Sequence, residues 1–127
     1  MMSRFWMMLG AVLAFVGLVV KGVVYHRLQG SDATPLREIL FIASDAHMIH
    51  AMAIIVIGVL TVQQGSSRLL GLAAIAFTAG IALFSGGIYS SLGGDAGFRS
   101  LTPTGGALLL AGWLLLAAGA YFGKSKT

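Results

Sequence analysis

The sequence predicts an all-α integral membrane protein, an antiparallel up-down-up-down bundle of four transmembrane helices. The chain has 127 residues, of which 57% are hydrophobic and only 9% charged, whereas a soluble domain has roughly 25% charged residues. Four apolar runs reach the length of about 20 residues that crosses a bilayer. Short connections make consecutive helices antiparallel neighbours. We therefore expect a single domain over residues 1–127, with spans at about 5–25, 35–62, 69–89 and 104–122.

The first span follows a short basic start and is similar to a signal peptide. However, the apolar run is too long for one. It ends in a polar group, which contains Lys21, Tyr25, His26 and Arg27, rather than in a small-residue cleavage site. We therefore predict that this segment is an uncleaved membrane span.

One face of the first span carries a stripe of small residues. Gly10, Ala14 and Gly17 are spaced by four and three residues, so they lie on the same side of a helix and allow another helix to pack closely. Lys21 continues this stripe, because eleven residues at about 100° each return to within about 20° of Gly10.

The second span is longer than a bilayer requires. Thr34 is a favourable N-cap and Pro35 suits the first helical position. The first turns carry Arg37, Glu38 and Asp45, so we expect them to project into the membrane interface or to lie against it.

The third and fourth spans form a hairpin joined by a polar loop at about 90–101. Small residues dominate their facing sides, and Ser85 and Thr104 stand beside them. We expect these two hydroxyls to hydrogen-bond across a close contact between the third and fourth helices. The full set of predicted helix-packing glycines is Gly10, Gly17, Gly86, Gly87, Gly105, Gly106 and Gly112.

Polar residues of all four helices are predicted to meet at one level of the membrane. At about 1.5 Å per residue, Lys21, Asp45, Ser85 and Thr104 all lie roughly 24–27 Å from the face that carries the amino terminus. The histidines of the second span fall slightly deeper, roughly 18–22 Å from that face. The candidate polar layer consists of Lys21, Asp45, His47, His50, Ser85, Tyr89 and Thr104.

Each member of this layer also has an ordinary structural interpretation. Lys21 either extends to the nearby interface, with its stem covering apolar surface, or faces the bundle and pairs with Asp45. Asp45 is either solvated at the interface or part of that pair. Tyr89 and Trp113 fit interface or packing positions.

A metal or haem site is not predicted. His47 and His50 are three residues apart, about 60° around the helix, which is typical of some metal ligands. His26 lies about 13 Å above His50, and the chain has no cysteine. Asp45 and His47 lie about 200° apart on their helix, so they form no local acid–base pair. We therefore expect hydrogen-bonded imidazoles and no cofactor.

Four segments resemble a small four-helix membrane family of unknown function, which includes the bacterial YgdD-like and the animal transmembrane-protein-256-like proteins. They are AHMIHAM at 46–52, FSGGIY at 84–89, TPTGG at 102–106, and the pair Gly112-Trp113. His26 and His50 stand where this family usually carries histidine. The chain departs from the family at Lys21, Ala46 and His47, where a small residue, an aromatic residue and a glutamine are usual. The resemblance implies the fold and a membrane location, and it supplies no established activity.

The function that the sequence favours is that of a non-catalytic membrane component. The net charge of +4 is too small and scattered for nucleic-acid binding, and it suits contact with anionic head groups. The expected partners are membrane lipid and a homo-oligomer or a larger membrane complex. The alternative is a small oligomeric transporter or channel that uses the polar layer. An enzyme would need a nucleophile–base arrangement that the sequence does not contain.

The distribution of basic residues predicts the orientation. Arg4, Arg68 and the terminal lysines Lys124 and Lys126 flank one side of the membrane, whereas Arg27, Arg37 and Arg99 flank the other. The positive-inside rule then places both termini in the cytoplasm, in a bacterial inner membrane.

Overall fold

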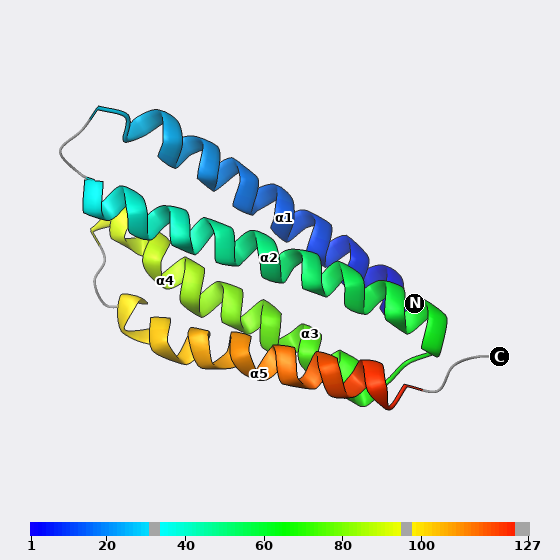
Figure 1. Ribbon diagram of the computed structural model, residues 1–127. Coiled ribbons are helices and arrows are strands. Elements are labelled where there is room, and N and C mark those ends of the chain that lie inside the picture. The colour runs from blue at the N-terminus through cyan, green and yellow to red at the C-terminus, as the bar shows by residue number, and fades with distance from the viewer. Residues whose placement is uncertain (31–33, 95–97, 124–127) are drawn as a thin grey trace.

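The computed structural model of the protein describes residues 1–30, 34–94 and 98–123 (Figure 1). These residues form helices and no β-strand. The elements are α1 (Met2–Arg27), α2 (Thr34–Gln64), α3 (Arg68–Gly80), the π-helical turn η1 (Ile81–Ser85), α4 (Gly86–Tyr89), the 3₁₀ turns η2 (Ser90–Gly93) and η3 (Phe98–Leu101), and α5 (Thr102–Tyr121). The side chain of Thr34, and Lys124 and Lys126, lie outside the described part, so the cap and the terminal charges stay predictions.

Four helical segments in this part are long and apolar enough to cross a membrane. They are Met2–Arg27, Pro35–Gln64, Arg68–Gly93 and Phe98–Tyr121. The third segment is continuous from α3 through η1, α4 and η2. The predicted fold class, an all-α membrane bundle, is confirmed.

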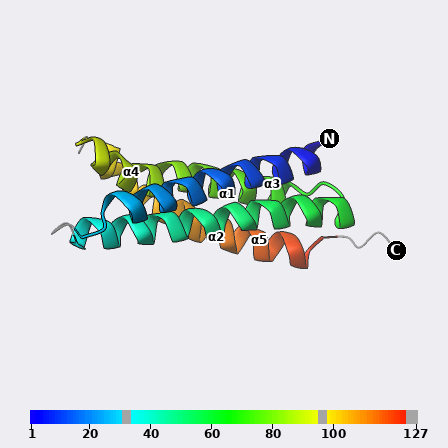
Figure 2. The same ribbon diagram turned by 90° about the horizontal axis from the view of Figure 1, so that it is seen from above.

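The helices are antiparallel neighbours in chain order, and the start of α1 and the end of α5 lie at the same end of the molecule (Figure 1). α1 packs mainly on α2, and α3 packs mainly on α5. Viewed from above, α1 and the α3–α4 helix lie toward one side, and α2 and α5 toward the other (Figure 2). In Figure 1, α2 and the α3–η1–α4 helix lie between α1 and α5, in the middle of the array.

Two apolar clusters fill the interior. The larger one surrounds Phe77 and Ile54 in the half of the bundle nearer the termini, and the smaller one contains Val24, Leu40 and Ile88 at the other end. Within a bilayer, lipid tails are as apolar as these side chains, so helix association depends on close packing and on hydrogen bonds between helices.

Glycines bring the helices into backbone contact. A Cβ atom at Gly105 would lie 2.8 Å from the carbonyl carbon of Leu83, and one at Gly10 would lie 2.8 Å from the carbonyl oxygen of Ala51. Real Cβ atoms do not approach other atoms this closely. Glycine at these two positions therefore sets the spacing of α5 against η1 and of α1 against α2.

The π-helical turn at Ile81–Ser85 was not predicted. Single π-turns insert an extra residue into an α-helix, which rotates everything beyond the turn. Here the turn carries Ser85, whose side chain is buried. The turn thus decides which neighbouring helix the Ser85 hydroxyl meets.

Candidate functional site

Lys21 of α1 and Asp45 of α2 form an ion pair at the end of the bundle away from the termini. The predicted pairing is present, but the two side chains are 41% and 54% exposed. Of the two interpretations given for Lys21, the pairing with Asp45 is present, but the pair lies on the outer surface of the bundle and not in its interior. The helical geometry explains the difference, because the interior face of α2 carries Ala43, Ser44 and His47, and Asp45 points away from it.

His47 is one of two buried members of the polar set, the other being Ser85, and it is only 3% exposed. Its Nδ1 lies 3.3 Å from the hydroxyl oxygen of Tyr89 in α4. The ring packs against Gly17 of α1, where a Cβ atom would lie 3.2 Å from the His47 Cγ. Nε2 is buried and has no hydrogen-bond partner among the described residues. His47 therefore connects three helices.

Ser85 donates a hydrogen bond of 2.9 Å to the carbonyl oxygen of Ala43 in α2. Both residues are fully enclosed. Thr104, by contrast, is exposed on the surface of α5. The expectation that Ser85 and Thr104 bond across the contact of the third and fourth spans is therefore wrong, since the π-helical turn aims Ser85 at α2.

His50 forms a second junction with α5. Its Nδ1 lies 2.6 Å from the carbonyl oxygen of Ala46, and the indole Nε1–H of Trp113 donates to its Nε2 at 3.1 Å. These two contacts define a neutral ring with the proton on Nδ1. Phe77 packs against both rings, with centroids 5.4 Å from His50 and 5.3 Å from Trp113. Both nitrogens of His50 are thus engaged within the protein.

The Trp113 contact was missed by sequence reasoning, which assigned this residue to packing or to the interface. Its partner lies 63 residues away in the chain, so no local pattern signals the bond. Among the described residues, no group of three or more His, Cys, Asp and Glu side chains has the arrangement of a metal site.

The predicted packing glycines fall into two groups. Cβ atoms at Gly87 and Gly112 would come within 2.7 Å of Thr102 and 2.6 Å of Phe77, so these sites admit only glycine without a shift. At Gly86 and Gly106 a Cβ would meet only ring atoms of Phe98 and Phe84, at 3.4 and 3.6 Å. The expectation that these two glycines are needed for close approach is therefore wrong. Gly10 and Gly105 belong to the tight group, whereas a Cβ at Gly17 would meet side chains of Met48 and His47 at 3.1 and 3.2 Å, an intermediate case.

A further tight glycine, Gly58, was not among the predicted set. A Cβ there would lie 2.9 Å from the Ser3 carbonyl oxygen in the first turn of α1. Its signal in the sequence is a spacing of seven residues from Ala51, whose carbonyl meets Gly10. Together these positions form the seam between α1 and α2.

The fully buried polar side chains of the described part, Ser44, His47 and Ser85, lie toward the end of the bundle away from the termini. Nearer the termini the fully enclosed side chains are apolar, and they include Ile54 and Leu70. The polar side chains there are only partly buried, and they bond to carbonyl oxygens: Thr61 and Thr78 within their own helices and Gln64 to Ala120. The enclosed apolar side chains separate the buried polar set from the other membrane face. In the described part of a single chain, the buried polar residues therefore form no continuous path across the bundle.

The comparisons with known proteins agree with a membrane location. A family model described as "Protein of unknown function (DUF423)" matches residues 22–106. The UPF0382 membrane protein SAB0533 of Staphylococcus aureus (strain bovine RF122 / ET3-1) is 29% identical over 89% of this chain and 92% of the relative.

A second relative, the UPF0382 membrane protein YwdK of Bacillus subtilis (strain 168), is 25% identical over 92% of this chain and 96% of its own length. No solved structure matches the chain. With four helices long enough to span a bilayer and relatives named as membrane proteins, this is a multi-pass membrane protein. The chain belongs to the DUF423 family of proteins of unknown function.

Proposed function

We propose that this protein is a non-catalytic membrane component that acts by associating with itself, with lipid or with a larger membrane complex. The observation that carries the proposal is that the packing glycines and the hydrogen-bonding side chains make their contacts within the bundle. Gly10, Gly105 and Gly112 allow close approach of neighbouring helices. Ser85 donates a hydrogen bond to α2, and both ring nitrogens of His50 are hydrogen-bonded within the protein. An active site would keep such groups available to a substrate.

The proposed location is a bacterial inner membrane with both termini in the cytoplasm. Both relatives named above are bacterial. Arg4 and Arg68 lie at the end of the bundle that carries the termini, and Arg27, Arg37 and Arg99 at the other. With Lys124 and Lys126 counted from the sequence and the ion-paired Lys21 set aside, four basic residues flank the first end and three flank the other, which favours the cytoplasmic side for the first end.

The proposed wider kinship is with the YgdD-like and transmembrane-protein-256-like proteins. Two of the segments that carry this resemblance, 84–89 and 102–106, pack on each other around Gly87 and Gly105. Their shared role in one helix contact supports a common fold, and it assigns no activity.

A small oligomeric transporter is the second candidate. The observation that favours it is the exposed Lys21–Asp45 ion pair within two apolar spans, because ionisable groups inside a membrane frequently mark transport pathways. Such a pathway would run between copies of the chain, since the fully buried side chains of one copy between His50 and the end that carries the termini are apolar.

The two candidates differ in how abundance and function respond to mutation. In a deletion strain, Gly105→Leu should lower the amount of protein in the membrane and its phenotype together, whereas Lys21→Met with Asp45→Asn should leave both near wild type. Gly106→Ala serves as the matched control for the glycine change. If the Lys21/Asp45 double variant is fully abundant but abolishes the phenotype, the accessory role is wrong and the ion pair is a working site.

A further inference from the structure

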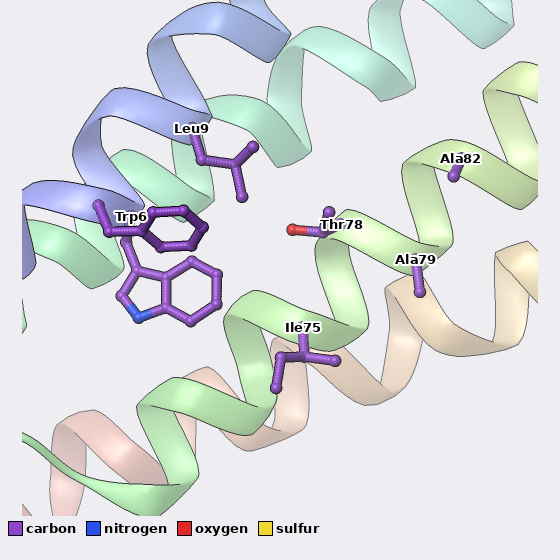
Figure 3. A pocket seen from close by; sticks show the side chains of 7 residues that line it. Trp6, Leu9, Ile75, Thr78, Ala79 and Ala82 are labelled. Atoms are coloured by element: carbon purple, nitrogen blue, oxygen red, sulfur yellow. The ribbon is translucent and has the colours of Figure 1, made fainter. Parts of the chain in front are cut away.

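Three cavities lie in a row between α1 and the α3–η1–α4 helix. Their volumes are about 380, 350 and 230 Å³, beginning at the end that carries the amino terminus. In the middle cavity, Trp6 and Leu9 of α1 face Ile75 and Thr78 of α3, with Ala79 and Ala82 on the same wall (Figure 3). The middle and inner cavities share Thr78 and Ala82.

Helical spacing aligns these three cavities along one line between the two helices, here called the α1–α3 groove. On each helix most lining residues recur every three or four positions, so they form a stripe along one face, and Phe5, Ala79 and Ile81 flank it. The stripe on α1 is Met2, Trp6, Leu9, Leu13 and Val16, and the stripe on the facing helix is Gly71, Ile75, Thr78, Ala82, Gly86 and Tyr89.

The groove has the dimensions of one lipid chain. From Phe5 to Val16 it extends for eleven residues, or about 16 Å, which is about half of the roughly 30 Å hydrocarbon core. The middle and inner cavities have volumes of about 350 and 230 Å³. Their walls expose only apolar atoms, as a hydrocarbon chain requires.

The mouth of the groove has a different chemistry. Ser66, Ser67 and Arg68 line it, and Ser67 makes no side-chain capping hydrogen bond. The acidic side chains that the structure describes, Glu38 and Asp45, belong to the first half of α2, and α2 begins at the other end of the bundle (Figure 1). A basic mouth with hydroxyl groups complements a phosphate, to which arginine donates charge-assisted hydrogen bonds.

We propose that the α1–α3 groove binds one anionic phospholipid from the leaflet on the amino-terminal side. Its phosphate lies at Arg68, and one acyl chain passes Trp6 and Thr78 and ends beside His47 and Tyr89, which line the inner cavity. The inference rests on the lipid association in the proposed function and names its site and lipid class. It is tested on purified protein, so a negative result leaves the accessory role, measured by phenotype, standing.

The test is native mass spectrometry of the protein titrated with phosphatidylglycerol and with phosphatidylcholine of the same chain length. Wild type should bind one phosphatidylglycerol about fivefold more tightly than phosphatidylcholine, the factor that one interfacial arginine contributes. Arg68→Gln should remove this preference, whereas Arg99→Gln, at the other membrane face, should retain it. Ala82→Phe should fill the groove and weaken both lipids, whereas Ala111→Phe, on the exposed surface of α5, should bind like wild type.

Ala79→Leu is the second groove-filling variant, so that a failure of Ala82→Phe to fold does not remove the test. Equal binding of the two lipids by wild type, or unchanged binding in the folded groove-filling variant, would overturn the proposal. The proposal would also be overturned if the wild type forms a dimer without lipid and either Ala82→Phe or Ala79→Leu dissociates that dimer. A second copy of the chain would then occupy the groove.

Discussion

The hydroxyl of Ser85 donates to the main-chain carbonyl of Ala43, 42 residues earlier in the chain, at 2.9 Å. This bond joins the π-helical turn to α2 in the middle of the array. The acceptor already belongs to the α2 backbone ladder, so the serine adds a bond between helices without depriving α2 of its own.

We predict that Ser85→Ala destabilises the folded protein by about 0.6–2 kcal/mol, the range for hydrogen bonds between helices in membranes. Unfolding with a denaturing detergent, followed by circular dichroism, measures the change. Thr104→Val, at an exposed hydroxyl on α5, is the control and should have little effect. Equal losses for both variants would contradict the assigned bond.

Neighbouring glycines of α5 should respond differently to the same substitution. In Gly105→Ala the new Cβ meets the backbone of Leu83 and Phe84 at 2.8 Å, and backbone cannot move aside as a side chain can. We expect a loss of about 1–3 kcal/mol or more. In Gly106→Ala the Cβ lies 3.6 Å from a ring atom of Phe84, and the change should stay within about 0.5 kcal/mol.

The same unfolding assay distinguishes these glycine variants. A large loss from Gly106→Ala, or none from Gly105→Ala, would mean that the contact between α5 and η1 is not as close as described. The comparison is well matched because the two sites are adjacent and receive the same methyl group.

For the Lys21–Asp45 pair we predict weak coupling. Both side chains lie on the outer surface of the bundle, toward the ends of their helices away from the termini, and ion pairs that interfacial water reaches contribute about 0–1 kcal/mol. Lys21→Met and Asp45→Asn should therefore have small and nearly additive effects in a double-mutant cycle in detergent. If the double variant instead regains about 3–5 kcal/mol of the unfolding free energy that each single variant loses, the pair behaves as a buried one. That result would contradict the weak coupling and show that the pair is shielded in the assembled protein.

The topology prediction is tested by cysteine labelling, which is clean because the chain has no native cysteine. With both termini in the cytoplasm, Gly94→Cys should react with an impermeant thiol reagent added to intact cells, and Ser125→Cys should react only after the membrane is permeabilised. Labelling of Ser125→Cys in intact cells would reverse the assignment.

The sequence determined by itself the number of spans, their approximate limits and the membrane as their solvent, because hydrophobic length is a local property that needs no partner. It also indicated that Lys21 and Asp45 would reach the same level of the bundle, since the rise of an α-helix is fixed.

Tertiary structure alone decided the direction in which each side chain points. The π-helical turn rotates Ser85 toward α2, and the orientation of α5 places Trp113 on His50 while Thr104 faces outward. Glycines that look alike in the sequence separated into Gly105, in contact with backbone, and Gly106, beside a ring. The physical reason is that a contact between helices depends on how each helix is rotated about its own axis, and here also on the extra residue inserted by the π-helical turn at Ile81–Ser85. The local hydrophobicity of the sequence shows neither of them.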